Sequence, residues 1–372
     1  VGPVSDYDLS KIQDPEPVLM IPRFQIGKVG VETKLEPLLR GKAGAKQVEV
    51  NAAGRVMREL ERREGTPGSD IQLSIDSALQ GYVQARLTGE SASAVIIDCE
   101  SGDLLACASA PTFDPNLFVR GISSKDYSEL TGNKYRPLAS KTVQGLYPPG
   151  STFKLVTAMA ALEAGLIGPD ETVYCPGHME VSGRRFHCWK RGGHGWVDLE
   201  TSLKRSCDIY YYDLAIKVGI EKISAMAKRF GLGQRHDVPM SAVAEGLTPT
   251  MEWKQINHGQ PWRVGDTVNA SIGQGFLLAS PLQLAVMSAR IATGRSVEPR
   301  LVKSVDGIEE PLRGGDSLGM NENNLRKMRR AMFAVVNDRR GTAYGSRVIE
   351  DSVRMAGKTG TSQVRNITAA ER

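Results

Sequence analysis

Near the middle of the 372-residue chain stands the stretch Tyr147-Pro148-Pro149-Gly150-Ser151-Thr152-Phe153-Lys154. The two prolines keep the residues before Gly150 extended, so a helix is expected to begin near Ser151. Apolar residues then recur at helical spacing as far as Gly165, a typical helix stop. Because three residues make just under one turn, Ser151 and Lys154 are predicted to share one face of this helix.

This placement suits nucleophilic catalysis. A serine hydroxyl is a poor nucleophile until a base takes its proton. The amine of Lys154 can act as that base if burial or a neighbouring cation keeps it neutral. The free N–H groups at a helix N-terminus can stabilise a developing oxyanion. A surface helix with a serine cap and a solvated lysine would show the same Ser-x-x-Lys pattern, so companion motifs must decide.

Two companion motifs follow in the order that acyl-serine enzymes use. The first is Ser206-Cys207-Asp208, which continues into an apolar, helical run over Ile209–Ala215. The second is Lys358-Thr359-Gly360-Thr361, preceded by Val353–Ala356, which is expected to begin a strand. Three motifs at domain-scale spacing favour a penicillin-binding or serine β-lactamase-like enzyme over a surface helix.

The chain resembles the class B penicillin-binding proteins, the D,D-transpeptidases that cross-link peptidoglycan, and in particular their elongation-type members. The resemblance covers roughly residue 20 to the end. Division-type relatives usually have Asn where this chain has Asp208. Besides the three motifs above, it rests on Leu146 before the nucleophile stretch, on Gly273-Gln274-Gly275 and on Ser280-Pro281-Leu282-Gln283.

The resemblance implies an α/β (α+β) fold with an antiparallel sheet and helices on both sides. Residues 1–70 are expected to be the remnant of a non-catalytic N-terminal pedestal domain, and residues 71–372 the transpeptidase domain. A turn cluster over Thr66–Asp70 marks the predicted boundary, although a strand and helix packed on the main domain would read similarly. The chain ends 12 residues after Gly360, where the family has further strands and a closing helix. Helices are predicted over 76–87, 280–293 and 324–337, and a hairpin around Gly102.

Composition fits a soluble globular protein, with 41% hydrophobic and 24% charged residues and a net charge of +5. Nothing indicates nucleic-acid recognition, and no apolar run is long enough to span a membrane. The family is normally anchored by one N-terminal helix. We therefore expect an excised region that works at the periplasmic face of the bacterial inner membrane, with its anchor outside this sequence.

Three cysteines and a histidine form a second group of functional candidates: Cys175, Cys188, His194 and Cys207. Three thiolates and one imidazole are typical of a structural zinc site, and some elongation-type relatives resemble this arrangement. A Cys175–Cys188 disulfide, natural in the periplasm, or unrelated thiols are the alternatives, and His178 and His187 are competing ligands. Cys99 and Cys107 are expected to be core thiols, with a cross-strand bridge between them left open.

By resemblance, Ser151 attacks the carbonyl between the last two D-alanines of a stem peptide, and Lys154 takes its proton. Ser206, held by Asp208 and Lys358, relays the proton to the leaving D-alanine. The charge of Lys358 is expected to favour neutral Lys154 and to bind the substrate carboxylate.

The substrate-binding residues implied are Thr359, Gly360 and Thr361, with the N–H groups of Ser151 and Thr361 as the oxyanion hole. A β-lactam would acylate the same serine. The implied partners are stem peptides, β-lactams, and a membrane-embedded glycan polymerase with its scaffold proteins. A hydrolase of the same superfamily and a non-catalytic β-lactam sensor are the rival functions.

Overall fold

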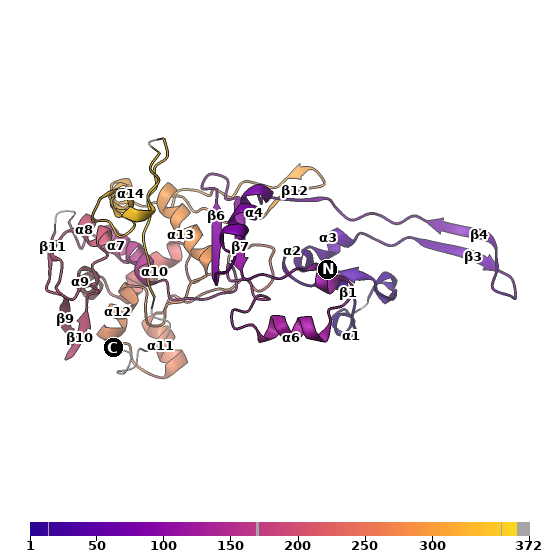
Figure 1. Ribbon diagram of the computed structural model, residues 1–372, viewed down its shortest axis with the longest axis horizontal. Helices are drawn as coiled ribbons and strands as arrows, with labels where there is room; N and C mark the ends of the chain where they lie inside the picture. The colour runs from indigo at the N-terminus through magenta and orange to yellow at the C-terminus, as the bar shows by residue number, and fades with distance from the viewer. Residues whose placement is uncertain (14, 169–170, 351, 363–372) are drawn as a thin grey trace.

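Helix α7 (Lys154–Glu163) lies at the centre of the larger part of the molecule in the computed structural model, which describes residues 1–13, 15–168, 171–350 and 352–362 (Figure 1). Every residue of α7 except Glu163 is buried, because its apolar side chains occupy all faces of the helix. Four helices pack around it: α8 (Leu199–Lys204), α9 (Asp208–Val218), α10 (Ile220–Arg229) and α14 (Glu322–Asn337). This bundle positions the nucleophile stretch.

The predicted helices are confirmed, and their N-termini are capped as their sequences indicate. Asp76 accepts a hydrogen bond at the start of α4 (Ser77–Arg86). Ser280 and Gln283 form a capping box before α13 (Pro281–Thr293). The remaining helices of the body are α5 (Asn116–Val119), α6 (Ser124–Gly132), α11 (Met251–His258), α12 (Val264–Ser271) and the 3₁₀ turn η3 (Tyr344–Ser346).

The hairpin expected around Gly102 is formed by β6 (Ala92–Ile97) and β7 (Leu104–Ala110), which pair antiparallel. Helix α4 packs against β7 and α13 against β6. Cys107 pairs in register with Val95 rather than with Cys99, and all five cysteines are free thiols. A second sheet joins β5 (Ile71–Leu73) to β12 (Val302–Val305) and β13 (Ile308–Glu309).

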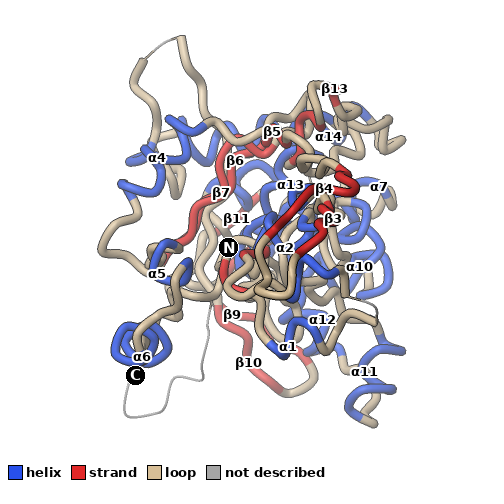
Figure 2. The backbone as a smooth tube through the Cα atoms, turned by 90° about the vertical axis from the view of Figure 1, so that its right-hand side faces the viewer, coloured by secondary structure: helices blue, strands red, loops and turns tan. Residues whose placement is uncertain are grey.

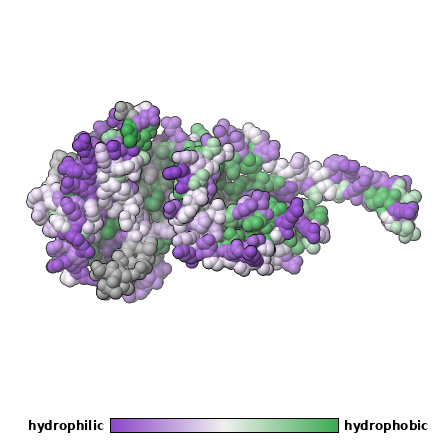
Figure 3. All heavy atoms as spheres, viewed as in Figure 1, coloured by the Kyte–Doolittle hydropathy of each residue, from purple (hydrophilic) through white to green (hydrophobic). Residues whose placement is uncertain are grey.

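The N-terminal region forms an arm at one end of the molecule (Figure 1). Its long hairpin, β3 (Ala45–Val50) with β4 (Val56–Arg63), has no buried residue, and Met57 is one of its exposed apolar residues. Hydrophobic residues are visible near the tip of this hairpin (Figure 3). The arm contacts the body where Ser241 Oγ accepts a 2.8 Å hydrogen bond from the N–H of Gly30. Its other elements are β1 (Gly2–Pro3), α1 (Asp6–Leu9), η1 (Pro17–Met20), β2 (Gln25–Ile26), α2 (Gly30–Lys34) and α3 (Glu36–Arg40).

At the opposite end of the body, residues 173–197 form a small lobe, here called the Cys–His lobe (Figures 1 and 2). It consists of two two-stranded antiparallel sheets: β8 (Val173–Cys175) with β11 (Gly195–Val197), and β9 (His178–Val181) with β10 (Arg184–His187). Such short strands bury little apolar surface, so the lobe needs other contacts for its order.

The strand expected at Val353–Ala356 is not formed, and this prediction was wrong. Residues 352–362 contain no strand, and two hydrogen bonds join this segment to helix α14. The N–H of Gly357 donates to the carbonyl of Met332, and the side chain of Asn337 donates to the carbonyl of Met355. Within the described residues no helix is long and apolar enough to cross a membrane.

Candidate active site

Ser151 lies on a 3₁₀ turn, η2 (Gly150–Phe153), that runs directly into α7. Three segments meet at this turn through glycines. A Cβ on Gly150, whose φ is +57°, would lie 2.5 Å from the carbonyl oxygen of Thr361. A Cβ on Gly273 would overlap the backbone of Gly150, whose N–H donates to the carbonyl of Gly273. Only glycine permits these backbone approaches.

Lys154 is 0% exposed, and its ammonium group uses all three of its donors. It bonds to Asp208 Oδ1 at 2.6 Å, to the carbonyl of Ser206 at 2.9 Å and to Ser206 Oγ at 3.2 Å. In the described part of the chain no hydrogen bond joins it to Ser151. The first two motifs are thus brought together around a buried ion pair.

Ser206 is the meeting point of the two lysines, since its Oγ also accepts a 3.0 Å hydrogen bond from Lys358. Burial, and then the positive charge of Lys154, lower the pKa of Lys358 to about 7, against the opposite effect of Asp208.

The Lys358–Thr361 segment packs flat against the turn that carries Ser151. A Cβ on Gly360 would lie 2.9 Å from the side chain of Thr152, so this glycine keeps the two segments close. The hydroxyls of Thr359 and Thr342 lie 2.8 Å apart, which ties the segment to the loop after α14.

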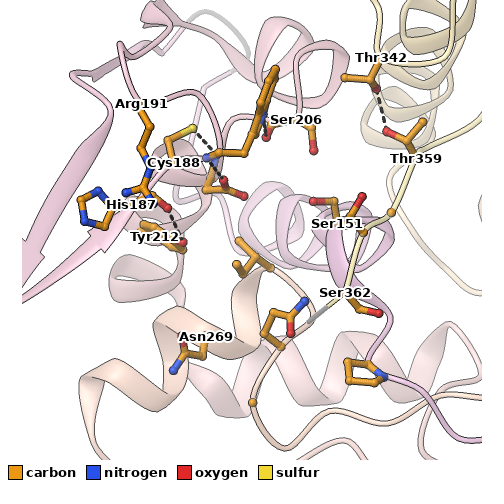
Figure 4. Close-up of a pocket in the computed structure, with 18 residues that line it drawn as sticks. Ser151, His187, Cys188, Arg191, Ser206, Tyr212, Asn269, Thr342, Thr359 and Ser362 are labelled. Carbon is orange, nitrogen blue, oxygen red and sulfur yellow. Dashed lines mark hydrogen bonds between the residues drawn. The ribbon is translucent and has the colours of Figure 1, made fainter. Parts of the chain in front are cut away.

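Ser151, Ser206, Asp208 and Thr359–Thr361 line an open cavity of about 1420 Å³ (Figure 4). Ser151 and Thr359 lie on one side, and His187 and Arg191 of the Cys–His lobe lie on the other. The lining residues that sequence reasoning did not assign to the active site are His187, Trp189, Arg191, Tyr212, Asn269, Ile272, Thr342 and Ser362. Of these, only His187, Trp189 and Arg191 could have been suggested by the sequence, because they lie close to the cysteine motif.

The four predicted metal ligands come together at the edge of this cavity, which Cys188 also lines. The ligand atoms of Cys175, Cys188, His194 and Cys207 all lie within 4.8 Å of one another. His194 Nδ1 faces the sulfurs of Cys175 and Cys188 at 3.6 and 3.5 Å. Its Nε2 is buried with no hydrogen-bond partner among the described residues. His178 and His187 stand outside the cluster, and the free thiols of Cys175 and Cys188 do not form the alternative disulfide.

The chemistry of the cluster fits a thiophilic cation. A hydrogen bond from Cys207, together with His194, holds the pKa of the Cys188 thiol well below its usual range. The same contact and burial raise the pKa of Cys207. Three sulfurs and one imidazole nitrogen at this spacing match the donor set of a closed, four-coordinate zinc site.

Two family models match the chain. The penicillin binding protein transpeptidase domain matches residues 92–370, and the penicillin-binding protein dimerisation domain matches residues 1–73. The chain therefore belongs to the penicillin-binding protein transpeptidase family. The expected family and fold are confirmed.

The individual relatives place the chain near one branch of that family. It is 38% identical over its whole length to the peptidoglycan D,D-transpeptidase MrdA of Acinetobacter baumannii and 36% identical to that of Escherichia coli. It spans 56% and 60% of those two proteins. The expected resemblance to the elongation-type enzymes is thus confirmed.

Solved structures agree. Pseudomonas aeruginosa PBP2 in complex with WCK 5153 matches 95% of this chain and 77% of its own, with a TM-score of 0.83 and 38% identity. Helicobacter pylori PBP2 in complex with MreC matches 98% of this chain and 67% of its own, with a TM-score of 0.87 and 33% identity.

Proposed function

We propose that this chain carries the acyl-transfer site of a peptidoglycan D,D-transpeptidase. The observation that supports it most is the convergence of Lys154 and Lys358 on one hydroxyl, Ser206 Oγ, in the cavity that also holds Ser151. The relatives named D,D-transpeptidase supply the reaction type.

The proposed first step needs a neutral Lys154. Lys154 passes a proton to Ser206 Oγ while the Ser206 proton moves to Lys358, whose pKa of about 7 leaves a neutral amine available. Neutral Lys154 then takes the proton of Ser151 as the Ser151 Oγ bonds to the substrate carbonyl carbon. Charged Lys358 and the hydroxyls of Thr359 and Thr361 hold the terminal carboxylate.

The second half of the reaction breaks the peptide bond. The N–H groups of Ser151 and Thr361 stabilise the oxyanion. The departing D-alanine amine takes a proton through Ser206, leaving an acyl-serine, and an amine of a second stem peptide then displaces Ser151. A β-lactam would form the same ester and stay.

Intact-mass spectrometry with penicillin tests this proposal. The chain should gain the mass of one penicillin, and Ser151→Ala should gain none while keeping its melting temperature. Rapid loss of the adduct would favour the hydrolase instead, and labelling of Ser151→Ala would assign the nucleophile elsewhere.

Zinc is the cofactor we infer for the Cys–His lobe, held by Cys175, Cys188, His194 and Cys207. When bound it supplies structural order and no open coordination position. Protein purified without added metal should carry close to one zinc per chain by elemental analysis. Metal-free protein would contradict the assignment.

Residues 1–70, bounded near Asp70, are proposed to be part of a pedestal that contacts a membrane-embedded glycan polymerase and its scaffold at the periplasmic face of the inner membrane. Support comes from the dimerisation-domain match and from two similar structures: the H. pylori complex with MreC, and a peptidoglycan synthase complex that coordinates polymerization and crosslinking. Substitutions within Phe24–Asn51 should weaken polymerase activation in a reconstituted full-length pair; unchanged activation would contradict this.

A further inference from the structure

Trp189 occupies a junction between the Cys–His lobe and the active site. Its backbone N–H donates a 2.8 Å hydrogen bond to Asp208 Oδ2. Its indole Nε1–H donates to the carbonyl of Ser206 at 3.0 Å and is shared with that of Arg205 at 3.1 Å. One residue of the lobe therefore bonds to two residues of the second catalytic motif.

The backbone of Ser206 requires such support. Its φ is +52°, in the left-handed region that non-glycine residues rarely adopt. Such a conformation persists only where the surroundings over-determine it. The Ser206 carbonyl accepts one bond from Lys154 and one from Trp189, which together use both of its lone pairs. A rotation of this peptide would move Ser206 Oγ away from the two lysines.

The orientation of the indole is itself fixed by the lobe. Trp189 follows Cys188 directly, and its ring lies edge-on to that of His194, with centroids 5.5 Å apart. The side chain is 60% exposed and lines the cavity, so it is not simply a core residue. At this position the indole exposes a large apolar surface to water, which is unfavourable. The hydrogen bonds of its Nε1–H explain why it nevertheless lies there.

We propose that Trp189 is a positioning residue for acylation: its indole N–H holds the Ser206 peptide in the conformation that aims Ser206 Oγ at Lys154 and Lys358. The proposal rests on the proposed function above. It assigns Trp189 a role in the rate of the covalent step rather than in ligand affinity or in folding.

The test removes the indole N–H of Trp189 and keeps the shape of the ring. Benzothienylalanine at position 189 keeps the shape of the ring and removes the N–H, and Trp189→Phe is the simpler variant. Trp196→Phe is the matched control, because Trp196 is 69% exposed on the same lobe, packs on Tyr174 and does not line the cavity. Penicillin acylation is followed at several concentrations to separate the dissociation constant from the acylation rate constant, and melting temperatures are measured alongside.

The isostere should lower the acylation rate constant by about twofold to tenfold, the range expected for one neutral hydrogen bond. Its dissociation constant and melting temperature should match those of the wild type, and Trp196→Phe should change neither kinetic constant. An isostere that acylates at the wild-type rate, or that changes only the dissociation constant, would overturn the inference alone. A wild-type chain that penicillin does not acylate would overturn the proposed function and this inference together.

Discussion

Two walls of the cavity are stabilised by different kinds of interaction. The helical wall consists of the turn η2, which carries Ser151 and runs into the buried helix α7, and of α9; most residues of α7 and α9 are buried among apolar side chains. The loop wall on the other side is the Cys–His lobe, which has few buried residues and is held by hydrogen bonds and a sulfur cluster. Packing fixes the nucleophile and its lysine, whereas polar contacts fix the residues that face them.

The difference indicates how each wall should respond to change. Damage to the helical wall leaves a buried charge or a void, which is costly for the whole fold. A substitution in the loop wall should have a local effect, because this wall is held by individual hydrogen bonds and sulfur contacts and not by a shared apolar core. Cys207 joins the two, since it is the N-cap residue of α9 and a member of the sulfur cluster.

The largest effect is expected for Lys154→Ala in the helical wall. It leaves Asp208, which is largely buried, without its ion-pair partner, at a cost of about 3–5 kcal/mol in the free energy of unfolding. Acylation should slow by about 10²- to 10⁴-fold. Denaturant unfolding and penicillin kinetics measure both. The double variant Lys154→Met with Asp208→Asn should recover much of the stability and none of the acylation rate. If Lys154→Ala were as stable as the wild type, the proposed difference between the two walls would be contradicted.

Next in size is Cys207→Ser, which tests the link between the walls. If the cluster binds zinc, this variant should lose the metal and about 2–3 kcal/mol of unfolding free energy. Limited proteolysis should then cut within residues 173–197 first. Cys99→Ser is the control, since Cys99 is a free thiol outside the cluster. Equal stability of the two serine variants would show that the lobe does not depend on its sulfurs.

A smaller, pH-dependent effect is expected at Lys358. Its pKa in the folded chain is about 7, below the ordinary value of 10.5, so between these values the unfolded chain binds one more proton than the folded chain. The free energy of unfolding should therefore rise with pH in this window, by at most about 1.4 kcal/mol per pH unit. Below pH 7 the destabilisation caused by charging the buried Lys358 is fully present.

Denaturant unfolding from pH 6 to 10 measures this slope, which Lys358→Met should remove and the exposed-lysine control Lys125→Met should keep. In the same window the affinity for penicillin should weaken as pH rises through about 7, because Lys358 loses its charge. A Lys358→Met variant with the wild-type slope would exclude Lys358 as its source.

The smallest effect is expected for Arg191→Gln, on the cavity side of the lobe. Arg191 has no hydrogen bond or ion pair within the described residues, so unfolding free energy should change by less than about 0.5 kcal/mol. Penicillin, an anion, should bind slightly more weakly at low ionic strength and equally well at high salt. Arg184→Gln, at an exposed site outside the cavity, is the control. A salt-independent loss would point to a direct contact instead of a long-range charge effect.

Sequence reasoning succeeded where a short-range pattern decides the structure. The helices α7, α9, α13 and α14 and the β6–β7 hairpin follow from apolar periodicity, and α13 and α14 also from their capping residues. The three motifs and the cysteine–histidine set also meet in space as expected. These features depend on residue type and spacing, which the sequence displays.

Sequence reasoning failed where the structure depends on a long-range partner. The strand predicted at Val353–Ala356 is absent, and the carbonyl of Met355 accepts a hydrogen bond from the Asn337 side chain of α14, which lies 18 residues away in the sequence. No pattern shows that Ser206 adopts a positive φ, or that the three N–H groups of Lys154 are all directed to the second motif. For Trp189 the sequence shows only its place beside Cys188, since its indole bonds to carbonyls 16 and 17 residues further along the chain.

The glycines that seal the nucleophile turn also restrict how drug resistance could arise in such a protein. At Gly150, Gly273 and Gly360 any side chain would meet neighbouring backbone or the Thr152 side chain, so mutation there should distort the turn that presents Ser151 and, with it, the proposed acyl-transfer activity. Escape variants are instead expected among cavity side chains that touch little else, such as Arg191 and Asn269. An inhibitor that draws its affinity from the backbone of the sealed turn would therefore leave a bacterium few viable substitutions to select.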